Sequence, residues 1–352
     1  MTERRVPFVS LVPGEDAAEV RAAVDRVIAS GWFVLGPEVE AFEDEFARAC
    51  GARHAVGVGT GTDAIALALR GLGIGSGDEV ITTPLSAAYS ALAVLMAGAR
   101  PIFADIDPAR LTIEPRAIEA AIGPRTRAIL PVHLYGQPAD MRAIHDVAER
   151  HHLAVVEDCC QAHLATEHHR PVGTIGAAGA FSFYPTKNLA ALGDGGAIVT
   201  NDAGLAARLR RLRNGGQTDR YRHVEAGINS RLDEIQAAVL RARLARLPAW
   251  TGRRRELAAR YRAGLAASTD GGIVVPPEFD PGHVYHLFVV RSAGRDELQR
   301  QLAGRGIETL IHYPIPIPQQ PAFGAGDPAA CPIASRVCRE ILSLPLHPAL
   351  AD

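Results

Sequence analysis

The stretch AFSFYPTKNLAALGDGGAIVTN, residues 180–201, says most about how this chain folds and what it does. Its two apolar runs, 180–184 and 196–201, predict buried strands, and the residues between them predict a glycine-containing loop. Lys187 lies in that loop and is the only lysine among the 37 lysines and arginines of the chain. Because arginine keeps its proton in proteins and lysine can lose it, this position indicates a chemical role for a free amine.

Similar apolar runs precede this stretch, and helical patterns lie between them. Strands that alternate with helices are typical of an α/β fold with a mostly parallel central sheet and helices on both faces. The predicted strands cover 54–59, 79–84, 100–106, 127–136 and 153–160, with helices such as 62–72 and 139–151 between them.

The chain after Asn229 has a different pattern, with an arginine-rich helical region that breaks near Pro248. A strand over 284–291, a helix over 295–306 and a proline-rich segment over 307–321 follow. These patterns predict a smaller α+β unit at the C-terminal end of the chain.

The length and the change of pattern together predict two domains. Residues 1–245 form the predicted large domain and residues 246–352 the smaller one. The sequence leaves open on which of the two residues 1–30 pack.

The composition favours an enzyme or binding protein for small molecules. Hydrophobic residues make up 47% and charged residues 22%, which is typical of a soluble globular protein, and the net charge of −2 gives no reason to expect nucleic acid or membrane as a partner. The chain start has no apolar leader, and the five cysteines show no CxxC spacing, so we expect a reduced, cytoplasmic setting. No His or Cys spacing suggests a metal.

A lysine amine is the group that condenses with the aldehyde of pyridoxal phosphate, and the chain offers the other parts of such a site. Asp158 ends an apolar strand and supplies the carboxylate that keeps the pyridine nitrogen protonated. The segment GVGTGTDAIALAL, 57–69, predicts a strand, a glycine turn and a helix start, where backbone N–H groups bind phosphate. It is neither GxGxxG nor a Walker loop, so a dinucleotide or ATP is disfavoured.

Four segments together resemble the nucleotide-sugar aminotransferases of the DegT family, which are fold-type I pyridoxal-phosphate enzymes with a large domain and a smaller C-terminal one. The segments are VEDCCQAH (156–163), FSFYPTKNLAALGDGGAIVT (181–200), RNGGQTDRYRHVEAGINSRLDEIQAAVL (213–240) and IHYPIPIPQQP (311–321). The resemblance covers nearly the whole chain in order, and it implies an aminotransferase that cycles between pyridoxal and pyridoxamine phosphate.

The resemblance implies roles around the cofactor ring. Lys187 would form the Schiff base, Asp158 would pair with the pyridine nitrogen, and Gln161 would lie near the phenolic oxygen of the ring. The aromatic residue that usually covers the outer face of the ring would be Tyr89, and the alternative for this residue is a helix tyrosine packed in the core.

The resemblance also implies the phosphate ligands and the assembly. Gly61, Thr62 and Ser182 would hold the phosphate, and Asn229 would reach it from the partner subunit. A homodimer with shared active sites is therefore expected.

The chain departs from the usual pattern at a few positions. Cys159 and Cys160 stand where small residues are common in the family. Ala190 stands where glycine often follows the KNL of residues 187–189. None of these changes removes a functional group. Relatives with histidine in place of the lysine are dehydratases, so Lys187 argues against that branch.

The loop KNLAALGDGG, 187–196, is similar to that of enzymes that aminate C-3 of a 3-keto sugar. The expected substrate is a dTDP-linked 3-keto-6-deoxyhexose, with a UDP-linked 3-keto sugar or a 4-keto sugar as alternatives, and L-glutamate is the expected amino donor. Candidate sugar contacts are Tyr184, Tyr221, His312 and Tyr313. Two other classes stay open: a non-catalytic regulator with this fold, and an α/β enzyme that does not use pyridoxal phosphate.

Overall fold

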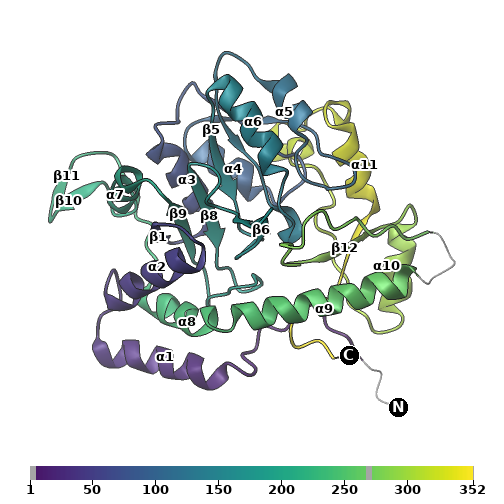
Figure 1. The fold of residues 1–352 in the computed structure, drawn as a ribbon, viewed down its shortest axis with the longest axis horizontal. Helices are drawn as coiled ribbons and strands as arrows, with labels where there is room; N and C mark the ends of the chain where they lie inside the picture. Colours follow the sequence, from purple (N-terminus) through teal and green to yellow (C-terminus); the bar gives the residue numbers. More distant parts are fainter. Residues whose placement is uncertain (1–4, 267–271, 352) are drawn as a thin grey trace.

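A seven-stranded sheet forms the centre of the molecule in the computed structural model, which describes residues 5–266 and 272–351 (Figure 1). The pairs β8–β5, β5–β4, β4–β2 and β2–β3 are parallel, and β9 runs antiparallel to both of its neighbours. The predicted, mostly parallel α/β sheet is therefore confirmed. In spatial order the strands are β1 (His54–Val58), β9 (Gly196–Thr200), β8 (Ala178–Ser182), β5 (Ala154–Asp158), β4 (Thr126–Leu130), β2 (Glu79–Thr82) and β3 (Arg100–Phe103).

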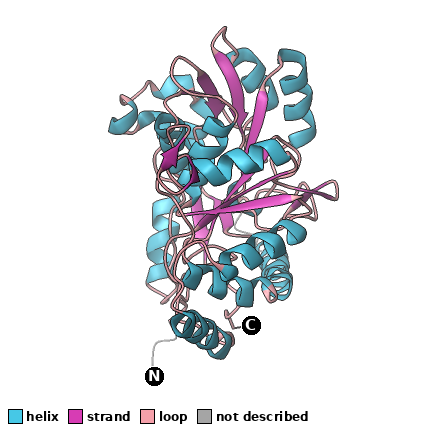
Figure 2. Cartoon of the chain, turned by 90° about the vertical axis from the view of Figure 1, so that its left-hand side faces the viewer, coloured by secondary structure: helices cyan, strands magenta, loops and turns pink. Residues whose placement is uncertain are grey.

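Helices cover both faces of this sheet because its strands are apolar on both sides (Figures 1 and 2). Successive residues of a strand point to opposite faces, so Ala180 packs with one set of helices and Phe181 with the other. One face carries α3 (Gly61–Gly71), α4 (Tyr89–Met96) and α7 (Ala203–Leu212). The other face carries α2 (Pro37–Ala49), α5 (Pro115–Ala121), α6 (Met141–His151) and α8 (Glu234–Leu244).

Aromatic packing fixes the strand that leads to the lysine. Phe181 and Phe183 are fully buried, and their rings meet Phe46 of α2 edge-on, with ring centroids 5.1 and 5.3 Å apart. Because these two residues point to the α2 side, Ser182 between them points to the opposite face, toward the start of α3.

A long helix, α9 (Leu247–Ala266), joins the sheet to the C-terminal elements (Figure 1). The helical region breaks at residues 245–246 and not at Pro248, which lies in the first turn of α9. A proline is tolerated there because the first N–H groups of a helix have no partner within the helix. The predicted break near Pro248 therefore lies two to three positions before the proline.

The C-terminal elements form a small α+β unit. The antiparallel pair β12 (Phe288–Arg291) and β13 (Ile341–Leu344) packs on α9, with α10 (Arg295–Ala303) and α11 (Pro332–Glu340) beside it. The strand predicted over 284–291 begins only at Phe288. The four residues before it do not extend the strand, and Tyr285 has a φ of 46°.

The N-terminal segment contacts both parts of the molecule. Val6 pairs with Ile307 of the C-terminal unit, whereas α1 (Ala17–Ser30) packs on α8 through Ala23 and Val27. Among the described residues, no helix is long and apolar enough to cross a membrane.

The remaining elements are short. A hairpin of β10 (Gln217–Asp219) and β11 (Arg222–His223) projects from the body beside α7 (Figure 1). The others are the pair β6 (Thr166–Glu167) and β7 (Arg170–Pro171) and the 3-10 turns η1 (Leu134–Gly136), η2 (Ile317–Gln319), η3 (Pro321–Phe323) and η4 (Pro328–Ala330).

Candidate active site

The loop that carries Lys187 leaves the sheet at the end of β8 and is held at several points. The Lys187 amide donates to the Tyr184 carbonyl at 2.8 Å, and the Ala191 amide donates to the Phe183 carbonyl at 2.7 Å. Asn188, which is buried, donates to the Val284 carbonyl at 3.0 Å. The backbone around the lysine is therefore fixed by the sheet on one side and by the C-terminal half of the chain on the other.

Lys187 itself is half-buried and makes no ion pair with any described residue. Burial lowers the pKa of its amine, and the nearby Cys160 and Asp158 offset part of this shift. A lowered pKa makes the neutral, nucleophilic amine easier to reach than at an exposed lysine.

Asp158 lies at the carboxyl end of β5 and is 4% exposed. Its Oδ2 accepts a hydrogen bond from the Ser90 hydroxyl at 2.7 Å, and its Oδ1 accepts one from the Cys160 amide at 3.1 Å. The sequence did not predict Ser90, although this residue directly follows Tyr89 in the segment predicted to cover the ring. The carboxylate is thus oriented at the strand ends, where open α/β sheets bind ligands.

A second buried carboxylate, Glu157, precedes Asp158 in β5 and therefore points to the opposite face of the sheet. It accepts from the amides of Gly173, Ile175 and Gly176 at 2.7–2.8 Å and pairs with Nε2 of His133 at 3.0 Å. Its ligand atoms, those of His133 and the thiol of Cys159 lie within 4.8 Å of one another. Because the carboxylate and the ring nitrogen already make these hydrogen bonds, the group acts as a structural network that supports β5.

The start of α3 faces Ser182, as the phosphate prediction requires. The Thr60 hydroxyl caps α3 by accepting from the Asp63 amide at 3.0 Å, and Gly61 and Thr62 follow as its first residues. A methyl group on Gly61 would lie 2.6 Å from Cβ of Ser182 and 2.8 Å from Sγ of Cys160, so only glycine fits. Free N–H groups at a helix start next to a hydroxyl suit a phosphate.

Gln161 connects the two parts of the chain at the site. Its Oε1 accepts from the Tyr135 amide at 2.7 Å, and its Nε2 donates to the Tyr313 hydroxyl at 3.0 Å. Burial raises the pKa of Tyr313. The carbonyl of His312 accepts from the Tyr135 hydroxyl, so both residues of the predicted His-Tyr pair lie at this junction.

Neutral histidines surround the lysine. Burial and the charge of Lys187 lower the pKa of His163 to about 3 and that of His312 to about 4, and they lower that of His286 well below its usual value. These rings are therefore uncharged at neutral pH and add no positive charge that would compete with Lys187.

The remaining predicted residues lie on the surface. Tyr89 is 64% exposed at the start of α4, so its alternative role as a packed core tyrosine is wrong. Tyr184 and Tyr221 are 51% and 83% exposed, and Asn229 is exposed as well. Among the described residues, no hydrogen bond or ion pair joins Tyr221 or Asn229 to Lys187 or Asp158.

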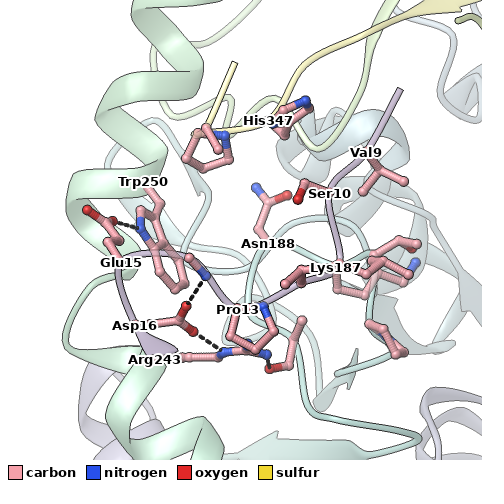
Figure 3. Close-up of a pocket in the computed structure, with 18 of the residues that line it drawn as sticks. Val9, Ser10, Pro13, Glu15, Asp16, Lys187, Asn188, Arg243, Trp250 and His347 are labelled. Carbon is pink, nitrogen blue, oxygen red and sulfur yellow. Dashed lines mark hydrogen bonds and ion pairs between the residues drawn. The ribbon is translucent and has the colours of Figure 1, made fainter. Parts of the chain in front are cut away.

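A pocket of about 570 Å³ opens next to the lysine loop (Figure 3). Its wall includes residues 9–16 from the N-terminal segment, 185–188 from the loop and 347–349 near the C-terminal end. Figure 3 shows Trp250 and Lys187 on opposite sides of this pocket. The sequence predicted none of its residues apart from the lysine.

A half-buried lysine beside a buried aspartate, both at the carboxyl ends of a mostly parallel sheet, defines the class of α/β pyridoxal-phosphate enzymes. These groups fit this cofactor, because the amine, the carboxylate and the helix start could bind its aldehyde, ring nitrogen and phosphate, respectively. More specifically, the chain belongs to the DegT/DnrJ/EryC1/StrS aminotransferase family, which it matches over residues 15–352.

Several relatives match the chain over nearly its whole length. The dTDP-3-amino-3,4,6-trideoxy-alpha-D-glucose transaminase of Streptomyces venezuelae is 52% identical over 351 residues, 98% of this chain and 92% of the relative. The crystal structure of S. venezuelae DesV in complex with a ketimine intermediate has a TM-score of 0.95 at 52% identity and covers 99% and 94% of the two chains. NtdA from Bacillus subtilis, with bound cofactor pmp, has a TM-score of 0.92 at 32% identity and covers 99% and 82%.

These matches confirm the predicted family, fold and cofactor. The chain is an aminotransferase of a pyridoxal-phosphate-dependent family. The alternative of an α/β enzyme that does not use this cofactor is therefore wrong.

Proposed function

We propose that the enzyme transfers an amino group from L-glutamate to C-3 of a dTDP-linked 3-keto-6-deoxy sugar. The observation that carries this proposal is the 52% identity, over 98% of the chain, to a transaminase named for a dTDP-3-amino sugar. The buried Lys187–Asp158 site supports the reaction type, and the similarity of the loop after the lysine supports the position of the new amine.

Each cofactor-binding group has a proposed task. Bound pyridoxal phosphate supplies an aldehyde for amines and a ring that delocalises electrons from the reacting carbon. Asp158 would keep the ring nitrogen protonated, and Gln161 would bind the phenolic oxygen. Ser90 and the Cys160 amide support this role because they orient the carboxylate of Asp158.

The phosphate of the cofactor would bind at the start of α3. Gly61, Thr62 and Ser182 supply backbone and hydroxyl donors there, with Asn229 reaching in from a partner subunit. Tyr89 would cover the outer face of the ring, since its side chain is exposed at the start of α4.

Lys187 moves the proton in both halves of the reaction. Its amine takes the proton from Cα of the amino donor in the first half and delivers a proton to C-3 of the sugar in the second. The lowered pKa of Lys187 favours the neutral amine that the first of these steps needs.

The sugar and its diphosphate would contact aromatic side chains at the mouth of the site. Tyr184 and Tyr221 are exposed, and His312 and Tyr313 stand at the junction of the two parts of the chain.

We assign the junction to a domain boundary near residue 245, between α8 and α9. We also propose that the enzyme works in the cytoplasm, since its five cysteines are free thiols.

A homodimer with shared active sites completes this proposal. Tyr221 sits on the projecting β10–β11 hairpin, and Asn229 is exposed, so both can reach a second copy of the chain. Mixing Lys187→Ala subunits with Asn229→Ala subunits creates heterodimers with one intact site. Their activity should recover toward half of the wild-type value, provided that each parent is strongly impaired. Heterodimers no more active than either parent would contradict shared sites.

The regiochemistry is tested with ¹⁵N-labelled L-glutamate and a panel of dTDP- and UDP-linked 3-keto and 4-keto sugars. Nuclear magnetic resonance of the product locates the nitrogen through its coupling to the neighbouring proton. Nitrogen at C-3 of a dTDP-sugar is the expected result. Efficient turnover of 4-keto or UDP-linked sugars alone would refute the proposed substrate and leave the aminotransferase class unchanged.

A further inference from the structure

The pocket beside the lysine loop contains a buried arginine that pairs with no carboxylate in the described part of the chain. Arg254 lies on α9, is 7% exposed and lines the pocket. Its Nη1 donates to the carbonyl oxygens of Tyr285, His286 and Leu346 at 2.8–3.3 Å. Among the described residues, Nε and Nη2 have no hydrogen-bond partner, and no carboxylate pairs with the guanidinium. Burial lowers its pKa to about 10, so it is still charged at neutral pH.

The carboxylates that line this pocket already have partners. Oδ2 of Asp16 accepts from Nε of Arg243 at 2.7 Å, and both side chains are buried. Oε1 of Glu15 accepts from Nε1 of Trp250 at 2.6 Å. Lys187, Arg243 and Arg254 outnumber the two carboxylates, so the described part of the wall has an excess of one positive charge while Lys187 is protonated. A buried charge without a counter-ion is costly, and an anion would relieve that cost.

A buried histidine on the same wall adds a second unused donor. His347 is 6% exposed, and neither of its ring nitrogens makes a hydrogen bond to a described residue. Burial lowers its pKa, and the backbone of Pro7, which lies near the ring without forming a full hydrogen bond to it, offsets part of the shift, so the ring is neutral and carries one N–H. Buried polar groups in proteins nearly always have a partner, so an unpaired ring facing a cavity indicates a ligand.

We infer that this pocket binds the side-chain carboxylate of the amino donor, held by Arg254 and His347. The unused Nε and Nη2 atoms form the edge of the guanidinium that binds a carboxylate through two hydrogen bonds. A dicarboxylic amino acid bound here would direct its amine toward Lys187, which lines the same pocket. This inference rests on the proposed function, since it names the residues that select a dicarboxylic donor.

The holoenzyme tests the inference through its first half-reaction, followed by the absorbance of the bound cofactor. L-Glutamate and L-alanine differ in the side-chain carboxylate, so the ratio of their kcat/KM values isolates this contact. Arg254→Gln and His347→Phe should each lower that ratio about 10- to 100-fold, the loss expected when one hydrogen bond to a charged group is removed. Arg254→Lys should retain more of the preference than Arg254→Gln, because it keeps the charge.

Glu15→Gln is the matched control, since it removes a carboxylate from the same wall without touching the donors. It should not lower the preference for glutamate. Equal losses with both amino acids in the Arg254 and His347 variants would show that these residues only hold the fold, and would overturn the inference. A loss confined to the sugar half-reaction would assign the anion to the sugar diphosphate and would also overturn it.

A binding measurement separates this inference from the proposed function. Glutarate has two carboxylates and no amine, so calorimetry measures its binding to the holoenzyme without any turnover. We expect binding to the wild type and to Glu15→Gln, and binding weaker by about 10- to 100-fold in Arg254→Gln. If the wild type reacts with no amino acid, the proposed function fails, and glutarate binding still decides the inference. No difference between wild type and Arg254→Gln would refute it.

Discussion

Replacing Glu157 by glutamine should destabilise the enzyme strongly, although Glu157 touches neither the pocket nor Lys187. The carboxylate accepts four hydrogen bonds, two on each oxygen. Oε1 accepts from the amides of Ile175 and Gly176, and Oε2 is bonded to the amide of Gly173 and the ring of His133. Glutamine keeps one oxygen and replaces the other by an NH₂ group.

The expected loss follows from the number of donors left without an acceptor. Whichever way the amide is turned, two donors of the buried network face an NH₂ group instead of an oxygen. Each buried donor that loses its acceptor costs about 1–3 kcal/mol, so the free energy of unfolding should fall by about 2–6 kcal/mol. Folded domains have a total of about 5–15 kcal/mol, so this loss is a large fraction of the stability.

Urea unfolding followed by circular dichroism measures this change, with the slope of the transition compared between variants. Glu149→Gln is the control, because Glu149 is 70% exposed on α6 and should change the stability little. If the free energies of unfolding of Glu157→Gln and the wild type differ by less than about 1 kcal/mol, the reasoning is refuted, since at least two buried donors must lose their acceptor.

Two further substitutions test the site, and a change of pH tests the buried histidines. Ser90→Ala removes one of the two protein donors to Asp158 and should slow the half-reaction with glutamate about tenfold or more, and a rate within about twofold of wild type would contradict this role. Lys187→Arg should keep the fold and abolish transamination in a coupled assay, because arginine cannot supply a neutral amine; activity within about tenfold of wild type would reject the assignment. Burial lowers the pKa of His163 and His283 to about 3 from 6.5, so the unfolded chain takes up protons first as the pH falls. Stability should therefore be complete above about pH 6.5 and fall by about 2 kcal/mol per histidine at pH 5, and a melting temperature that stays flat between these values would contradict this.

The sheet and the lysine could be predicted because they depend on local pattern. Strands buried on both faces need continuous apolar runs, and the run from Ala178 to Ser182 has this character. Lys187 stands out because it is the only lysine of the chain, and Asp158 stands out because it is a carboxylate at the end of an apolar strand.

The contacts that complete the site could not be predicted, because they join residues distant in sequence. Gln161 meets Tyr313 across 152 positions, and nothing near either residue indicates the other. Arg254 was one arginine in an arginine-rich helix, and only the fold shows that it is buried without a carboxylate partner among the described residues. The start of β12 at Phe288 was missed because residues 284–287 do not join the ladder, and Tyr285 among them has a φ of 46°.

The half-buried Lys187 and the buried Arg254, which both line the pocket, explain why one position needs lysine and the other can use arginine. Burial lowers the pKa of Arg254 only to about 10, so its guanidinium stays charged at neutral pH and can hold an anion permanently. The same effect acts on Lys187: the pKa of a lysine amine is ordinarily 10.5, below that of arginine, and desolvation lowers it from that value. A group that must release its proton and form a covalent bond therefore has to be the lysine. An enzyme with arginine at position 187 and lysine at position 254 would have the same total charge. It would lack both the nucleophilic amine and the guanidinium that binds a carboxylate.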